Sequence, residues 1–131
     1  IDLEEYNGST LRTLMKIDNE LLDKYKFATV TFEHDIYNWN KYNTREVSRQ
    51  IFEKRGYCRV FSDINNGGEN PFEDWYVHPD LVDMVHVKNI QEKNKNNYKM
   101  AVVGEDYKRK GPNEWVCPEN FLSINYQDII Y

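Results

Sequence analysis

Residues 27–35 read Phe-Ala-Thr-Val-Thr-Phe-Glu-His-Asp, a run of β-branched, aromatic and small residues that ends in three ionisable ones. A run of this kind without polar alternation predicts a strand that is covered on both faces, as in a parallel or mixed sheet between helices. In such sheets the ligand crevice lies beyond the carboxyl ends of the strands. The sequence therefore predicts that Glu33, His34 and Asp35 lie at the rim of a binding site.

The residues before this run predict a strand, a helix and a second strand in succession. Residues 1–4 alternate apolar and acidic side chains, as at the end of a strand with Asp2 and Glu4 on one side. Residues 10–17 carry leucines and a methionine at the spacing of one buried helical face. Such a crossover makes the two strands parallel, so Asp2 and Glu4 should emerge at the same edge of the sheet as Glu33.

Two more helices are predicted downstream. Asn43 and Glu46 have the spacing of a capping box, and Gly56 is the expected stop of the helix that they begin. Pro79 suits the first position of a third helix that runs as far as Ile90. Each boundary is predicted from the local chemistry of helix ends.

Two strands are expected between these helices. Residues 57–64 alternate in the manner of a strand, and residues 74–78 resume the pattern after a loop rich in glycine and asparagine at residues 65–71. The short connection predicts an antiparallel hairpin, which would lie beside the strand at residues 27–35.

Composition excludes some classes of protein. The chain has 131 residues and a net charge of -5, with 17 basic residues among 22 acidic ones and no basic face, which argues against a nucleic-acid partner. No apolar stretch approaches the roughly 18 residues of a membrane span, so no membrane partner is expected. Cys58 and Cys117 follow no metal-ligand spacing. We therefore predict reduced thiols and a cytoplasmic location.

Three segments, residues 26–35, 53–57 and 70–82, resemble in order and spacing the C-terminal half of FkbM-type methyltransferases. The first ends in Glu-His-Asp, the second reads Glu-Lys-Arg-Gly-Tyr, and the third contains Phe-Glu-Asp-Trp-Tyr-Val-His-Pro. Ile-Asp-Leu-Glu at residues 1–4 also looks like the family's acidic fourth-strand motif. The resemblance covers residues 1–82. The family's glycine-rich first strand and turn, which hold the cofactor, have no counterpart in this chain.

The resemblance implies a fold, a cofactor and a reaction. It implies the C-terminal half of a Rossmann-like class I methyltransferase fold, with a mixed sheet and an antiparallel terminal hairpin over residues 1–90. Residues 91–131 match nothing in the family, and we expect them to be an extension that packs on this domain. The implied reaction is transfer of a methyl group from S-adenosylmethionine to a hydroxyl of a sugar or related small molecule. A missing N-terminal segment or a partner chain would have to supply the glycine-rich half.

Removal of a hydroxyl proton requires a base near the methyl donor, and His34 is the candidate by its ordinary pKa. Glu33 or Asp35 would fix its tautomer or bind substrate hydroxyls, whereas Asp2 and Glu4 would contact the cofactor or a second hydroxyl.

Three side chains of the hairpin strand, Asp74, Trp75 and His78, are candidates for substrate binding. A structural role is the alternative for each of them, with Trp75 burying its ring and His78 ending the hairpin.

Other interpretations of the same residues stay open. A Glu-His-Asp run at a strand end can be a solvated edge, and its oxygen atoms can bind Mg²⁺. The half-domain can also be a scaffold or interaction module derived from a methyltransferase fold. The absence of a cofactor loop distinguishes these hypotheses, because backbone amides of such a loop grip the nucleotide.

Overall fold

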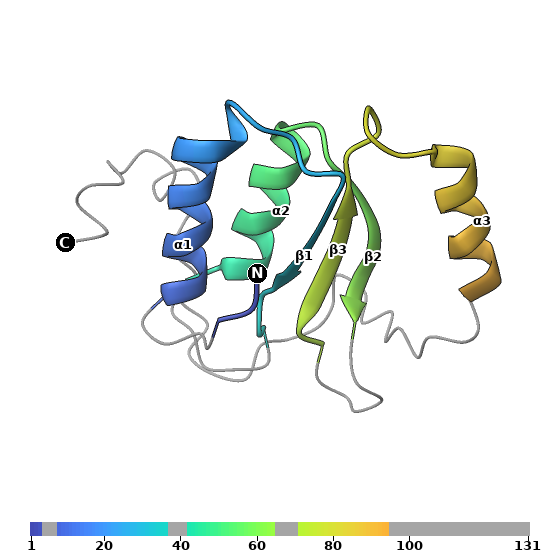
Figure 1. Ribbon diagram of the computed structural model, residues 1–131. Helices are drawn as coiled ribbons and strands as arrows, with labels where there is room; N and C mark the ends of the chain where they lie inside the picture. Colours follow the sequence, from blue (N-terminus) through green and yellow to red (C-terminus); the bar gives the residue numbers. More distant parts are fainter. Residues whose placement is uncertain (4–7, 37–41, 65–70, 95–131) are drawn as a thin grey trace.

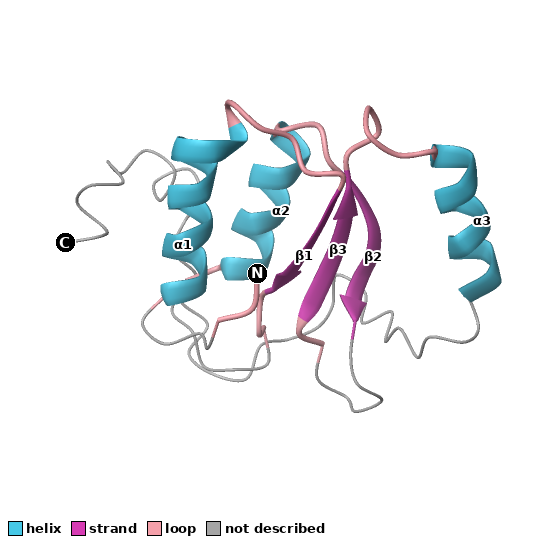
Figure 2. Cartoon of the chain, in the orientation of Figure 1, coloured by secondary structure: helices cyan, strands magenta, loops and turns pink. Residues whose placement is uncertain are grey.

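A computed structural model describes residues 1–3, 8–36, 42–64 and 71–94, which form an α/β fold (Figure 1). In chain order the elements are α1 Ser9–Ile17, the π-helical turn η1 Asp18–Leu22, β1 Thr29–Glu33, α2 Thr44–Lys54, β2 Cys58–Ile64, β3 Glu73–Val77 and α3 Met84–Asn94. Helices α1 and α2 lie on one side of the sheet and α3 lies on the other side (Figure 2).

The three strands form an antiparallel sheet in the order β1-β3-β2. Strand β3 is central and pairs with both neighbours, with Phe32 opposite Asp74 on one side and Phe61 opposite Trp75 on the other. The predicted hairpin of β2 and β3 is confirmed. Every adjacent pair of these three strands is antiparallel, and the parallel partner that the sequence predicts for β1 is the segment at residues 1–4.

Residue Ile1 hydrogen-bonds to the free edge of β1. Its amino group donates to the carbonyl of Thr31 at 2.6 Å, and its carbonyl accepts from the amide of Glu33 at 2.9 Å. Two bonds that flank Phe32 in this way follow the pattern of a parallel pair. The first residues thus run alongside β1 in the predicted direction, although residues 1–3 are not a strand and Glu4 lies outside the described residues.

The hydrophobic core lies between one face of the sheet and helices α1 and α2. It consists of the buried side chains Leu11, Leu14, Met15, Leu22, Phe32, Val47, Ile51, Phe52, Tyr57 and Tyr76. The ring of Phe52 is central, with its centroid 5.8 Å from that of Phe32 and 4.5 Å from that of Tyr76. Aromatic pairs at this spacing add to the stabilisation that burial provides.

The predicted covering of β1 on both faces is wrong. Phe32 is fully buried, whereas Thr29 and Thr31, whose side chains alternate with it, are exposed. Helix α3 leaves this second face partly open and has no buried residue of its own.

The prediction for helix α2 is confirmed at its C-terminal end only. Gly56 has φ 86°, the left-handed conformation expected of a glycine that ends a helix. At the start, the side chain of Asn43 makes no capping hydrogen bond, and Glu46 accepts instead from Arg45, with Nε and Oε1 2.7 Å apart. The predicted capping box is therefore absent.

The predicted start of the third helix at Pro79 is also wrong. Helix α3 begins at Met84, after Asp83 has capped it: Asp83 Oδ1 accepts from the amides of Val85 at 2.9 Å and His86 at 3.3 Å. A side chain that satisfies two free amides sets the boundary more strongly than the fixed φ of a proline.

Part of the sequence prediction lies outside the described residues. This applies to Glu4, to Cys117, to the loop at residues 65–70 and to residues 95–131 of the expected extension. Among the residues that the structure describes, no helix combines the length and the apolar character needed to span a membrane.

Candidate functional site

A group of three carboxyl side chains lies at the carboxyl end of β1. Pairing of Ile1 with the edge of β1 brings Asp2 beside Glu33, and Asp35 follows two residues later. Burial, a hydrogen bond with Asp2 and the charge of Asp35 together raise the pKa of Glu33 to about 8. Glu33 is therefore mostly protonated at neutral pH and shares a hydrogen bond with the Asp2 carboxyl group. The predicted approach of Asp2 to Glu33 is present, and Asp35 is buried with φ 46°.

The imidazole of His34 points away from this group, into the protein. Its Nδ1 accepts from the amide of Ile36 at 3.3 Å. Its Nε2 lies 3.5 Å from Asp63 Oδ1 and 3.7 Å from Asp74 Oδ1. A ring that accepts at Nδ1 and faces carboxylates at Nε2 carries its proton on Nε2. The catalytic role of His34 remains a prediction, and this buried arrangement favours a positioning role over that of a base.

The carboxylates that His34 faces belong to a buried ionic network between α2 and the sheet. Arg49 makes a two-point pair with Asp74, with Nε to Oδ2 at 2.6 Å and Nη2 to Oδ1 at 2.9 Å. Arg45 Nη1 lies 3.1 Å and Arg49 Nη2 lies 3.0 Å from Asp63 Oδ1. The guanidinium groups of Arg45 and Arg49 thus pair with the carboxylates of Asp63 and Asp74 at close range.

Backbone geometry brings the two aspartates together. Asp63 has φ 54° and lies where the register of β2 against β3 shifts between Phe61 and Ile64. Its amide donates to Asp74 Oδ1 at 2.8 Å. Burial disfavours the charge of Asp74, but the nearby His34 ring and the hydrogen bonds from Arg49 outweigh it and lower the pKa of Asp74 well below its ordinary value. Asp74 is therefore ionised at neutral pH.

A metal ion does not fit this network. His34, Asp63 and Asp74 each offer one ligand atom, all within 4.8 Å of one another. However, Arg45 and Arg49 already contact the Asp63 oxygen, and a cation there would meet two guanidinium groups. The sequence alternative of an Mg²⁺ site on carboxylate oxygens of the Glu-His-Asp run does not involve this network and stays a prediction.

The predicted substrate-binding residues are not gathered in one place. Asp74 is fully buried in the network at one end of β3. His78 follows the other end, where its amide bonds to Ala28 and its ring contacts Tyr57 at 5.0 Å between centroids. Trp75 lines a separate apolar cavity of about 340 Å³ between the sheet and α3. In this arrangement no single ligand of sugar size reaches all three side chains.

Sequence reasoning missed Arg45 and Arg49. They are four residues apart on α2, within the stretch that also buries Val47, Ser48 and Ile51. Charged residues at helical spacing inside a buried stripe are rarely left without partners, and that was the available signal.

The described residues offer little to hold the nucleotide part of a cofactor. Their glycines are Gly8, which precedes α1, and Gly56, which follows α2, and no others, so no glycine-rich turn is among these residues. The carboxyl groups of Asp2, Glu33 and Asp35 suit a positively charged sulfonium centre or sugar hydroxyls.

Comparisons of this chain with protein-family models, with curated proteins and with solved structures give no match.

Proposed function

We propose that this chain is the C-terminal half of an S-adenosylmethionine-dependent O-methyltransferase of the FkbM type, acting on a hydroxyl of a sugar or related small molecule. The sequence resemblance over residues 1–82 supports this, and so does the course of the chain. Ile1 runs parallel to β1, and the antiparallel pair β2 and β3 ends the sheet, as the resemblance implies. The observation that carries the proposal is the carboxyl pair of Asp2 and Glu33 at the carboxyl end of β1.

The proposal assigns the general base to Glu33. The donor, when bound, supplies an electrophilic methyl group on a positively charged sulfur. Transfer of this methyl group to a substrate hydroxyl would require removal of the hydroxyl proton. The hydroxyl proton passes to the Glu33 carboxylate, whose pKa of about 8 makes it a much stronger base than an ordinary carboxylate.

The neighbouring residues have supporting roles in this proposal. Asp2 holds Glu33 through their shared hydrogen bond, and the carboxylate of Asp2 also attracts the positive sulfur. His34 and the arginine-aspartate network fix the end of β1, because they join it to α2 and β3. Glu4, which lies outside the described residues, keeps its predicted role in contacting cofactor or substrate.

Activity in this proposal requires a glycine-rich half from a further segment or a partner chain. The described residues provide the base and the substrate side of the site, but no loop of backbone amides for the nucleotide.

The experiment compares Glu33→Gln with His34→Gln in the complete enzyme, using transfer of a radioactive methyl group to a panel of sugars and polyols. Loss of a general base typically costs about 10²- to 10⁴-fold in turnover, and this loss is expected for Glu33→Gln. His34→Gln should lower thermal stability and leave turnover per folded molecule within a few-fold of wild type. The opposite result, with turnover lost only in His34→Gln, would return the base to His34.

A scaffold or interaction module is the second candidate, and a specific observation favours it. The apolar groove beside β1 resembles a surface for assembly more than a polar active site. A complete enzyme that transfers no methyl group to any acceptor, with Glu33 still titrating near pH 8, would support this second function.

A further inference from the structure

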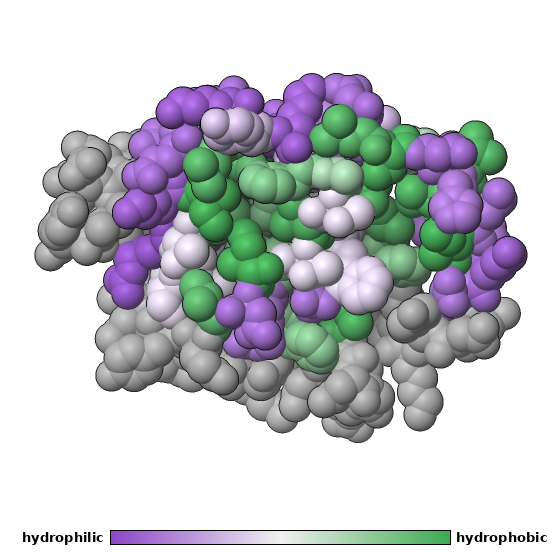
Figure 3. Space-filling view, in the orientation of Figure 1, coloured by the Kyte–Doolittle hydropathy of each residue, from purple (hydrophilic) through white to green (hydrophobic). Residues whose placement is uncertain are grey.

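An apolar cavity of about 340 Å³ lies between the sheet and α3, and we name it the α3 cavity. Its floor includes side chains from all three strands, namely Thr29, Thr31, Phe61, Trp75 and Val77. The threonines alternate with Phe32 and Trp75 precedes Tyr76, and both of these rings belong to the core. The floor is therefore the face of the sheet opposite to the core. Hydrophobic side chains gather on both sides of the sheet, next to α1 and next to α3 (Figure 3).

Helix α3 forms the wall of the α3 cavity that faces this floor. His86, Val87 and Ile90 line the cavity from the helix, yet no residue of α3 is buried. The helix is nevertheless fixed to the sheet, because Gln91 Nε2 donates to the carbonyl of Val60 at 2.7 Å. A fixed helix whose apolar side chains are only partly covered leaves space for another molecule between itself and the sheet.

The surroundings of the α3 cavity favour a small molecule over a strand or a helix. The floor is centred on β3, whose backbone pairs with β1 on one side and with β2 on the other. A further strand would therefore find no open ladder there. A helix with its side chains is about 10 Å across, and α3 already takes that position on this face of the sheet.

The dimensions of the α3 cavity suit a flat molecule. Three strands give the floor a width of roughly 10 Å, and the first two turns of α3 give the wall a length of about 11 Å. A volume of about 340 Å³ over such a floor is shallow. An apolar cavity of about 150 Å³ holds one benzene ring, so the α3 cavity has room for two fused rings.

The lining of the α3 cavity suits an aromatic molecule. The rings of Phe61 and Trp75 meet edge to face, with centroids 5.8 Å apart and planes at 85°. A flat ring between the sheet and α3 can stack on one of them and contact the edge of the other, the two arrangements that aromatic pairs prefer. Polar groups lie at the rim, where Thr29 and Thr31 are exposed and His86 faces them from α3. These groups can hydrogen-bond to a hydroxyl substituent.

We propose that the α3 cavity binds a flat aromatic molecule of two fused rings, with its polar substituent at the rim. The site is separate from the three carboxyl side chains at the end of β1, because none of them lines the cavity. The inference is independent of methyl transfer and requires no residue of the proposed catalytic site.

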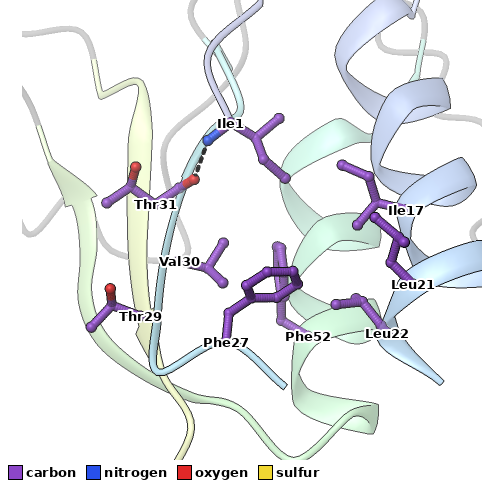
Figure 4. Close-up of a pocket in the computed structure, with 9 residues that line it drawn as sticks. All are labelled: Ile1, Ile17, Leu21, Leu22, Phe27, Thr29, Val30, Thr31 and Phe52. Carbon is purple, nitrogen blue, oxygen red and sulfur yellow. Dashed lines mark hydrogen bonds between the residues drawn. The ribbon is translucent and has the colours of Figure 1, made fainter. Parts of the chain in front are cut away.

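A second apolar cavity, of about 290 Å³, supplies an internal control (Figure 4). It lies between β1 and the helices of the core side, and the side chains of Ile17, Leu21 and Phe27 point into it (Figure 4). Leu21 is 39% exposed and does not line the α3 cavity. Leu21→Trp should therefore fill the second cavity and leave binding in the α3 cavity unchanged.

The test titrates 2-naphthol and 1-adamantanol into the full 131-residue chain by calorimetry. Both probes are uncharged alcohols with the same number of carbon atoms, but 2-naphthol is flat and 1-adamantanol is globular. One molecule of 2-naphthol should bind per chain with a Kd of about 0.1 mM or below. The affinity for 1-adamantanol should be at least about tenfold lower, because a shallow, packed cavity does not admit a globular molecule.

Variants of α3 locate the binding. Val87→Phe places a ring in the α3 cavity and should weaken binding of 2-naphthol at least about tenfold. Val85→Phe is the matched control, because Val85 is 70% exposed on the same helix and does not line the cavity, so its affinity should equal that of wild type. Ile90→Trp fills the cavity from a position that is 37% exposed, and it replaces Val87→Phe if that variant does not fold.

Several results would overturn the proposal. Absence of saturable binding of 2-naphthol, or equal affinity for 1-adamantanol, would show that the α3 cavity selects no flat ring. Loss of binding in Leu21→Trp alone would assign the ligand to the second cavity. Equal losses in Val85→Phe and Val87→Phe would place it outside both cavities. Self-association of the wild-type chain that competes with 2-naphthol and is lost in Val87→Phe would assign the α3 cavity to a second copy.

Discussion

Arg49 on α2 and Asp74 on β3 form a two-point ion pair, with Nε to Oδ2 at 2.6 Å and Nη2 to Oδ1 at 2.9 Å. Asp74 is fully buried, and Arg49 is its main cationic partner. Removal of one member leaves a buried charge without compensation, which typically costs about 3–5 kcal/mol. We therefore expect Asp74→Asn and Arg49→Gln each to lower the free energy of unfolding in urea by about this amount.

The double variant and an exposed pair are the controls for this prediction. If the two residues stabilise one another directly, the free energy of unfolding should fall less in the double variant than the sum of the decreases in the two single variants. Lys26 and Asp80 form an ion pair of 2.6 Å on the surface, and Lys26→Ala should leave the unfolding transition unchanged. Equal losses for the buried and exposed pairs would contradict the assigned role.

Substitution by alanine should lower the free energy of unfolding more at Gly8 than at Gly56. Both have positive φ, 75° and 86°, so alanine is strained at either position. An added Cβ at Gly8 would also lie 2.5 Å from Cε2 of Tyr42, whereas at Gly56 the nearest atom is His78 Nε2 at 3.5 Å. Gly56→Ala should lower the free energy of unfolding by about 1–2 kcal/mol. Gly8→Ala should cost more, and urea unfolding that finds equal losses would mean that Tyr42 moves aside freely.

Local chemistry explains which parts of the fold the sequence could predict. The strand at residues 57–64 and its partner were found within one residue, because alternation and a glycine-rich connection are local signals. The start of α3 was missed because two local signals competed, and the side chain of Asp83 prevailed over the ring of Pro79. Whether the second face of β1 is covered depends on where α3 packs, and no residue of β1 determines the position of that helix.

Some features of the candidate site were also predictable from the sequence and others were not. The approach of Asp2 to Glu33 follows from the direction of two neighbouring chain segments, so it was predictable. Pairing of Arg49 with Asp74 joins residues 25 positions apart, and it depends on the relative placement of a helix and a central strand. The turn of His34 into the protein also depends on that network, which is why its chemistry could not be inferred from its ordinary pKa.

The isolated chain should bind S-adenosylmethionine weakly or not at all. Its described residues supply carboxylates for the sulfonium end and no loop of amides for the nucleotide, so most of the binding contacts are missing. Calorimetric titration of the 131-residue chain should show no saturation at micromolar concentrations. Micromolar affinity would mean that the cofactor site lies elsewhere in the chain.

Stability should fall as pH rises from about 5 to 8 because of Glu33. Below pH 4.5, the ordinary pKa, its carboxyl group is protonated in both states. Between 4.5 and about 8 the unfolded chain releases this proton while the folded chain keeps it, so ionisation favours unfolding. Above about 8 both forms are ionised and the contribution is constant.

The titration of Glu33 is checked by comparing the urea unfolding of wild type and Glu33→Gln at several pH values. Glu33→Gln should be stabilised relative to wild type as pH rises through this window, whereas Glu20→Gln on the exposed surface of η1 should follow wild type. Parallel curves for wild type and Glu33→Gln would mean that Glu33 titrates alike in the folded and unfolded chain.

The rate of methyl transfer should depend on the same ionisation. A general base must be deprotonated to accept the hydroxyl proton, so kcat/KM of the complete enzyme should rise with pH and level off above about 8. Asp2→Asn removes a charge that helps to raise the pKa of Glu33, so the midpoint of the profile should move to lower pH. His34→Gln should leave the midpoint unchanged, because the ring faces Asp63 and Asp74 and not the carboxyl pair. A midpoint that moves in His34→Gln but stays in Asp2→Asn would identify His34 as the titrating base.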